Sequence, residues 1–510
     1  AGRKSMDSSD SATSARSNAL KHFDISDLCR ATPGRRCLHK GAALFQNAEG
    51  SAATYELSRV VNQIDVFISH NWEVPHRVKF LVLAFCFNHL HSWLVVLIFL
   101  LTVLLLTSAG VCPTISHESP AWGERTIGVL AVLVSTPLFV FSLFVSHELL
   151  LLLGFGGPMC FLDKSCIHQT DEARKAAGIK SLAAFLSNSR AMYVVFGDNY
   201  LKKLWTVYEL ASLMTLNPSA TLKIIPQFLP KFVIFAAMSQ WCVSIVEVFV
   251  FSASGSIALI VTTGATLVLF LLCRQWAHVR SKIEADMLAF DVRNARCMAA
   301  SDRTFVEGNI EVTMKGEGFV HDEVSKDEAL DAFNDLVRSK LPTQVLAKLG
   351  RAGVHFHHVL AIALPSLAKA VDVLGGAISD KGWSANAMFE FILRLSEALS
   401  TMNTTGFVLL LAKCCLSKGW LVWVLLALAA VVIRIGWSLL NAIPLSVRDK
   451  DEVVFGLAII LGFALQALVS CAIFRPVLKP TQWKGYSHTT KQHGDNLHPP
   501  NGASNMARNL

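Results

Sequence analysis

Charged residues are scarce in this chain. Asp, Glu, Lys and Arg make up 16% of its 510 residues, against about 25% in average soluble proteins. Apolar residues make up 53%, and much of this apolar content lies in long runs that carry almost no charge. This composition excludes an ordinary soluble enzyme and predicts a chain that crosses a membrane.

Three chemical signatures are also missing. The twelve cysteines form no Cys-x-x-Cys pair, which argues against a zinc ribbon or a thioredoxin-type redox site. No glycine-rich loop joins a strand to a helix, so neither a Walker nor a Rossmann nucleotide site is expected. No basic run is interleaved with aromatic residues, so nucleic acid is not an expected partner. The net charge of +8 fits the basic cytosolic face of a membrane protein.

Six segments come close to or reach the length of about 20 apolar residues that a membrane-spanning helix needs. Five contain at most one ionisable residue, and the sixth qualifies despite Arg434. The segments are Trp93–Ala109, Thr126–Ser146, Phe232–Ser252, Ser256–Cys273, Gly419–Leu439 and Val453–Phe474. Residues 1–55 lack the apolar core of a secretory signal peptide, so the first span is expected to act as the targeting signal.

Lys and Arg are distributed unevenly around these spans. Residues 1–91 carry eleven of them, whereas the loop between the first two spans carries only Arg125. The positive-inside rule then places the N-terminus in the cytosol, and six spans return the C-terminus to the same side. The prediction is an integral, multi-pass membrane protein with both termini in the cytosol and the lipid bilayer as its first partner.

Soluble strand patterns lie on both sides of the first two spans. The strand-like runs are Asp65–Ser69, Met159–Leu162, Ala191–Gly197 and Ala220–Phe228, with helical patterns between them. Alternating strands and helices predict an α/β fold with a flavodoxin-like parallel sheet. Without the intervening spans the strands would form one compact unit. We therefore predict a cytosolic domain split into 55–79 and 156–230, with a transmembrane hairpin, 80–155, inserted into it.

Composition also divides the rest of the chain. Residues 1–54 and 477–510 are polar and are predicted to be disordered. Residues 231–274 hold a second transmembrane hairpin, and 419–476 hold a third pair of spans. Between them, 275–418 are predicted to form a cytosolic helical region.

Five sequence motifs in order carry a family resemblance. They are "DVFISH", "CFLDKSCI", "SRAMYVVFGDNYLKKLWTVYEL", "KIIPQF" and, inside the third, Trp205-Thr-Val-Tyr-Glu209-Leu210. Together they resemble the first four strands of a TIR (Toll/interleukin-receptor) domain, and the last is similar to the family's W-C-x-x-E-L. Thr206 stands where the family usually has Cys, and the fifth strand is missing after Pro230. The whole chain also resembles multipass protist membrane proteins in which this module lies among spans.

The resemblance implies an enzymatic alternative. Some TIR domains cleave NAD at the nicotinamide–ribose bond, and a carboxylate would stabilise the cation-like sugar that forms. By resemblance that carboxylate is Glu209, and the nucleotide cleft would be lined by Asp65, Ser69, Trp72 and Trp205. No cofactor is required, because NAD would be the substrate. The other interpretation makes Glu209 a partly buried acid bonded to its neighbours.

Assembly is the commoner use of this fold. The loop Asp163–Gly178 corresponds in position to the loop through which TIR domains contact one another. Its candidate contact residues are Asp163, Lys164, His168, Asp171 and Arg174. The expected function is therefore signalling or scaffolding at a membrane, through self-association or contact with other TIR-like domains, with NAD hydrolysis as the alternative.

Two ionisable residues lie inside spans, where charge is costly and suggests function. Glu247 and Arg434 each lie five residues from the outer end of their spans, so they are expected at matching depth. A structural ion pair is the first interpretation. A substrate or ion site would make the protein a channel or transporter with a TIR-like regulatory domain. The run "HFHH", His355–His358, has no paired acids or cysteines, so no metal site is expected.

Overall fold

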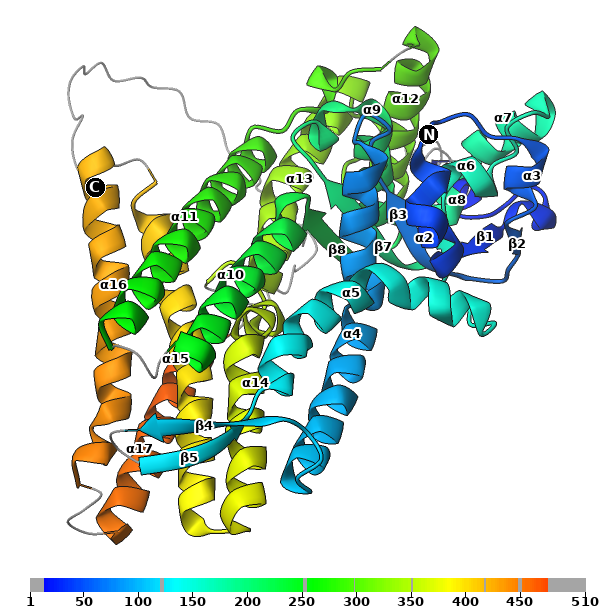
Figure 1. Cartoon of the computed structure of the whole chain (residues 1–510). Helices are drawn as coiled ribbons and strands as arrows, with labels where there is room; N and C mark the ends of the chain where they lie inside the picture. Colours follow the sequence, from blue (N-terminus) through cyan, green and yellow to red (C-terminus); the bar gives the residue numbers. More distant parts are fainter. Residues whose placement is uncertain are drawn as a thin grey trace, which may run out of the picture. The chain divides into compact units, whose positions relative to one another are not determined.

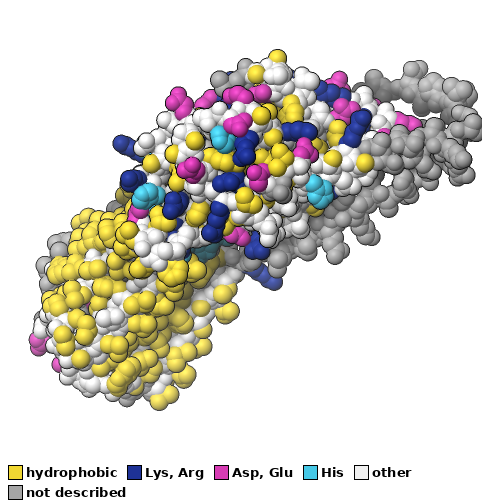
Figure 2. Space-filling model, turned by 90° about the vertical axis from the view of Figure 1, so that its right-hand side faces the viewer, with side chains coloured by type: hydrophobic (Ala, Val, Ile, Leu, Met, Phe, Trp, Pro, Cys, Tyr) yellow, Lys and Arg dark blue, Asp and Glu magenta, His cyan; other side chains and the backbone are white. Residues whose placement is uncertain are grey.

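A mostly parallel sheet and a bundle of long helices make up the described part of the chain (Figure 1). The computed structural model describes residues 13–119, 123–250, 255–297, 299–349, 352–416, 419–447 and 452–475. In Figure 2, charged side chains gather over the sheet-containing part, whereas hydrophobic side chains cover most of the bundle. The predicted disordered tail, 477–510, lies outside the described residues.

The sheet has six strands in the order β2-β1-β6-β3-β7-β8. The four strands from β6 to β8 run parallel, and β1 and β2 are antiparallel additions at one edge. Their bounds are β1 Arg30–Pro33, β2 Arg59–Val60, β3 Ile64–Ser69, β6 Met159–Phe161, β7 Ser189–Phe196 and β8 Thr221–Pro226. Among the described residues no strand follows β8, and helix α13 packs against β8 instead.

The two pieces of chain on either side of the hairpin meet in one sheet, as predicted. In β3, Val66 pairs with Cys160 of β6 and with Ala191 of β7. Between β3 and β6 the chain forms α4 (His76–Ser108), the antiparallel strands β4 (Thr114–Ser119) and β5 (Gly123–Gly128), and α5 (Leu130–Leu152). Helix α4 starts beside the sheet and continues without interruption into the bundle (Figure 1).

The prediction of a disordered arm over residues 1–54 is wrong for residues 13–54. This segment supplies β1, helix α2 (Gly34–Ala42) and helix α3 (Ala52–Tyr55). Thr32 is fully buried and hydrogen-bonds Ser165 at 2.8 Å, and Phe45 is 2% exposed. These short elements carry many polar residues, and the residues that they contact lie far away in the sequence. Local composition therefore gave no sign that the segment is folded.

Helices on both sides of the sheet complete its cover. Helix α6 (Asp163–Cys166), α7 (Glu172–Lys180) and α8 (Leu182–Ser187) connect β6 to β7, and α9 (Leu204–Leu216) connects β7 to β8. Helices α12 (Ala300–Gly316) and α13 (Lys326–Leu349) follow the bundle helix α11 (Gly255–Leu288) and return to the sheet. Asn309 of α12 donates a hydrogen bond to the Tyr208 hydroxyl of α9 at 3.1 Å.

Seven helices of the described residues are long and apolar enough to cross a membrane, one more than the six predicted. They are α4, α5, α10 (Phe228–Val250), α11, α14 (Phe356–Lys381), α16 (Trp420–Ala442) and α17 (Glu452–Phe474). These helices indicate a multi-pass membrane protein. The orientation of its termini stays a prediction.

The additional helix, α14, was assigned to the cytosolic region 275–418. It lies inside the bundle instead, where buried Asp372 accepts hydrogen bonds from the backbone amides of Ala131 and Val132 at 3.0 and 2.8 Å. These amides open α5 and have no partner within their own helix. Gly376 lets α14 approach β5, because a Cβ there would lie 2.3 Å from the Thr126 carbonyl oxygen. The predicted region is therefore divided: α12 and α13 pack on the sheet domain, and α14 packs in the bundle beside α15 (Ala385–Cys414).

Candidate functional site

Three polar side chains meet at the carboxyl ends of β3 and β7. Parallel α/β folds bind ligands at this end of the strands. Ser69 is the last residue of β3, Tyr200 follows β7, and Glu209 lies on α9. The Ser69 hydroxyl donates to Glu209 Oε2 at 2.5 Å and lies 2.5 Å from the Tyr200 hydroxyl. Ser69 is fully buried and Tyr200 is 1% exposed, while Glu209 is partly buried.

The position of Glu209 favours its neutral form. Burial raises the pKa of this carboxyl from 4.5 to about 8; the hydrogen bond from Ser69 opposes the shift and the charge of Asp163 adds to it. At pH 7 Glu209 therefore holds its proton in most molecules. Burial and the nearby Glu209 also raise the pKa of Tyr200. The three groups thus form a largely uncharged hydrogen-bonding network at neutral pH.

Trp72 lies in the loop after β3, at the same carboxyl end of the parallel strands. Its indole Nε1 donates to Asp163 Oδ2 at 2.8 Å, and its ring packs edge-on against His70 with centroids 4.6 Å apart. Lys79 Nζ lies 4.5 Å from the centroid of the Trp72 ring, a cation–π contact. No sequence pattern indicated Lys79, which is fully buried and whose Nζ has no hydrogen-bond partner among the described residues.

Two residues assigned to the cleft do not join this group. Asp65 lies near the start of β3, four residues before Ser69. Because a strand rises about 3.3 Å per residue, Asp65 lies toward the amino end of the strand, away from Ser69. There it accepts from the Met159 amide at 2.8 Å and pairs with Arg190 at 3.2 Å. Trp205 is not part of this group either; its indole N–H donates to Asp302 of α12 at 3.1 Å instead.

The predicted contact loop is internal at its start and exposed further on. Asp163 is held by Trp72, and Lys164, which is 7% exposed, donates to Asn47 at 2.8 and 2.9 Å. Lys164 is therefore buried under the N-terminal segment, whereas Asp163 is half-buried; their part in a contact surface stays a prediction. His168 packs on Tyr55, with ring centroids 4.6 Å apart.

The exposed part of the loop begins at Thr170. Asp171 caps α7 by accepting from the Arg174 amide at 3.0 Å, so the segment has a fixed backbone conformation. The Asp171 and Arg174 side chains are 45% and 49% exposed, and that of Glu172 is 83% exposed. The side chains available to a partner therefore carry both signs of charge.

A second candidate site lies inside the helical bundle. A polar cavity of about 350 Å³ is lined by residues from α10, α11, α14, α15 and α16, and both Glu247 and Arg434 border it. The predicted direct ion pair between these two residues is wrong. Glu247 pairs with Lys369 of α14 at 3.0 Å, and Lys369 also lies 3.5 Å from Glu397.

Arg434 is the cation of this cavity without a carboxylate partner. Its Nη1 donates to the Thr401 hydroxyl at 3.0 Å, and among the described residues no carboxylate oxygen lies within 4 Å of it. Arg394, by contrast, pairs with Glu397 at 2.5 Å. The sequence offered no signal for Lys369, Arg394 or Glu397, because α14 and α15 were not recognised as part of the bundle.

Comparison with known proteins points to the sheet domain. The family model for the TIR domain matches residues 159–233, from the start of β6 into α10. The match begins directly after the inserted hairpin, so β3 lies outside it, although β3 pairs with both β6 and β7. No curated protein and no solved structure matches the chain. The resemblance to multipass protist membrane proteins stays a prediction.

Proposed function

We propose, starting from the TIR domain at residues 159–233, that this multi-pass membrane protein signals or scaffolds a complex through self-association of that domain. TIR domains commonly self-associate. The observation that carries the proposal is the exposed, two-signed segment Thr170–Lys175 on the matched domain. Charges of both signs on a surface held by a capped helix suit contact between two copies, because complementary charges fix the orientation of docking.

Reversing charge on this segment should weaken self-association. In the variant Arg174→Glu/Lys175→Glu, residues 171–175 carry four acidic side chains, so two copies repel where they would attract. We expect the dissociation constant to rise about tenfold or more, since like charges in contact cost several kcal/mol. Sedimentation of the full-length protein in detergent, over a range of concentrations, measures it.

The matched control is Arg190→Glu. Arg190 is 64% exposed and lies at the start of β7, outside the Thr170–Lys175 segment. It should leave the dissociation constant unchanged at constant salt. If wild type and the Arg174/Lys175 variant associate equally, this surface does not mediate self-association. If wild type is strictly monomeric, the proposal of self-association is wrong.

NAD hydrolysis, the enzymatic alternative, draws less support. Ser69 and Glu209 do lie together at the ligand-binding edge of the sheet. However, stabilising a cation-like sugar requires a carboxylate, and the pKa of Glu209 near 8 leaves most molecules with a neutral acid at pH 7. Asp65 and Trp205 are also engaged elsewhere.

The cavity in the bundle favours a second candidate function, binding or passage of a small anion. Lys369, Arg394 and Arg434 line it together with Glu247 and Glu397. Among the described residues, Arg434 is the one of these three cations with no carboxylate oxygen within 4 Å. A cation held in a low-dielectric bundle is costly unless a counter-ion or water reaches it. A small anion beside Arg434 would remove that cost.

Halide flux tests this second candidate. Liposomes containing the protein should release chloride faster than empty liposomes, and Arg434→Gln should slow that release about tenfold or more, because it removes the unpaired charge. Ser438→Ala, a change on the same cavity wall, should leave at least half of the rate. Release at the rate of empty liposomes by the wild-type protein would exclude anion passage.

A further inference from the structure

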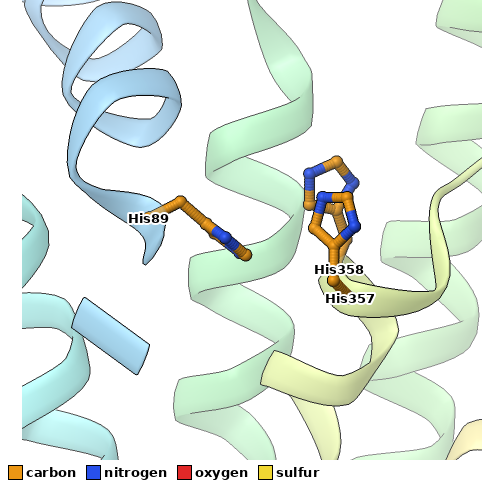
Figure 3. Close-up of side chains that lie close together, drawn as sticks. All are labelled: His89, His357 and His358. Atoms are coloured by element: carbon orange, nitrogen blue, oxygen red, sulfur yellow. The ribbon is translucent and has the colours of Figure 1, made fainter. Parts of the chain in front are cut away.

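Three histidines from distant parts of the sequence come together where α4 and α14 meet. Figure 3 shows the His89 side chain of α4 pointing toward His357 and His358 at the start of α14. One nitrogen of each imidazole lies within 4.8 Å of the nitrogens of the other two. The "HFHH" run gave no sign of this arrangement, because the third histidine is on a helix that the sequence places far away.

Two nitrogens of this cluster lack partners. His89 Nε2 and His358 Nδ1 are buried, and among the described residues neither has a hydrogen-bond partner. His358 is 6% exposed. A buried polar atom left unpaired costs roughly 1–3 kcal/mol, so a native protein is expected to supply something that binds there. A metal ion binds the lone pairs of several imidazole nitrogens at once.

The surroundings suit neutral imidazole ligands. Phe85, Trp93 and Phe139 pack around His89 with ring centroids 5.3 to 6.4 Å away, so an apolar shell keeps water from that ligand. His357 lies at the exposed side of the cluster. A metal bound here would therefore be shielded on one side and open on the other.

We propose that His89, His357 and His358 form a metal site for a first-row divalent ion, Zn²⁺ in particular, with a fourth position open to solvent. Imidazole is a preferred ligand of Zn²⁺, and three histidines with one open position is a known zinc arrangement. Zn–N bonds of about 2.0–2.1 Å in a tetrahedron place ligand nitrogens about 3.3 Å apart. Small side-chain rotations bring nitrogens that lie within 4.8 Å to that separation.

Nearby charge determines what occupies the fourth position. His357 and His358 lie in the first turn of α14, where the helix dipole is positive, and Lys223 of β8 acts electrostatically on all three imidazoles. Both oppose a cation at these imidazoles, so the fourth position of a bound metal ion is expected to hold an anion, such as hydroxide or chloride, that offsets the positive charge. The site would also fasten α14 to α4, the helix that continues from the TIR sheet.

Zinc binding by the full-length protein in detergent tests the proposal. After removal of metal with a chelator, wild type should bind one Zn²⁺ per chain with micromolar or tighter affinity, measured by competition with a chromophoric chelator. His89→Ala and His357→Ala should each weaken binding about 100-fold or more, because losing a ligand costs at least as much as losing its supporting contacts. Co²⁺ in place of Zn²⁺ should give the visible absorption of tetrahedral coordination.

Two controls separate this site from unspecific binding. His91→Ala changes another histidine of α4 whose ring contacts Arg35 and the Phe87 carbonyl, and it should leave affinity unchanged. A His488→Ala/His493→Ala/His498→Ala variant removes the histidines of the C-terminal tail and should also bind one Zn²⁺. The proposal fails if wild type binds no Zn²⁺ at micromolar concentration. It also fails if the His89 and His357 variants, eluting like wild type on gel filtration, bind as tightly as wild type does.

Discussion

Replacing Phe67 by Ala is expected to destabilise the split sheet by about 3–5 kcal/mol, the usual cost of removing a fully buried aromatic ring. Phe67 belongs to β3, before the inserted hairpin, and is 0% exposed. It stacks on Phe161 of β6, after the hairpin, with ring centroids 4.5 Å apart, and Phe161 contacts Phe185 at 4.3 Å. These three rings hold together the two pieces of chain that complete one sheet.

Hydrogen exchange measures this effect locally, which avoids unfolding the helical bundle. The amides of β7 pair with β3, so their exchange through opening of the sheet should accelerate about 100-fold or more in Phe67→Ala, at about 1.4 kcal/mol per tenfold. Phe155→Ala is the control, because that ring is 60% exposed. Equal protection of β7 in both variants would mean that β3 is not an integral strand of the sheet.

Replacing Glu209 by Gln is expected to remove a pH dependence of stability. The folded protein binds a proton at Glu209 up to a pKa of about 8, whereas an unfolded glutamate releases it near the ordinary value of 4.5. Between these values the native state holds more protons than the unfolded state, so wild-type stability falls as pH rises from about 5 to 8. Glutamine carries no charge at any pH, so the variant lacks this decline.

The expected gain of Glu209→Gln over wild type, between pH 5 and pH 9, is about 4 kcal/mol. It follows from the pKa change from 4.5 to about 8 at about 1.4 kcal/mol per pKa unit, less the part that an unfolded glutamate has already titrated below pH 5. Melting temperatures of the two proteins at pH 5, 7 and 9 measure the difference. Glu172→Gln, on an exposed side chain, is the control. A constant difference between wild type and Glu209→Gln across this range would contradict the assignment.

The same proton bears on the enzymatic alternative. If Glu209 acts as a carboxylate toward NAD, nicotinamide release by wild type should increase as pH rises through 8, because the ionised fraction increases there. Glu209→Gln should abolish the release at every pH. Release that is constant from pH 6 to 9 would exclude Glu209 as the group responsible.

Sequence patterns were informative where a local rule determines the structure. Short apolar runs between helical patterns indicate parallel β strands. The split sheet of β3, β6, β7 and β8 could therefore be predicted from the order of these patterns along the chain. The five ordered motifs also placed Ser69 and Glu209 in one domain. Asp65 was assigned to the cleft by resemblance alone; near the start of β3, it lies at the amino end of the strand, away from the carboxyl ends where ligands bind.

What the sequence did not reveal depends on distant partners. Helix α14 carries Pro365, Lys369 and Asp372, which made it look too polar for a bundle. Its Asp372 and Lys369 are bound by the α5 amides and by Glu247, and neither contact has a local signature. The same holds for β1, whose four residues form a strand because β6 lies beside them.

Helix α4 has a mechanical consequence. Its 33 residues, at about 1.5 Å each, make a continuous rod about 50 Å long. Lys79 near one end contacts Trp72, and the other end reaches the β4–β5 hairpin. A tilt of about 5° about one end moves the opposite end by about 4 Å over that length. A short displacement at the β4–β5 end of this rod therefore shifts Lys79 and the Trp72 ring at its other end.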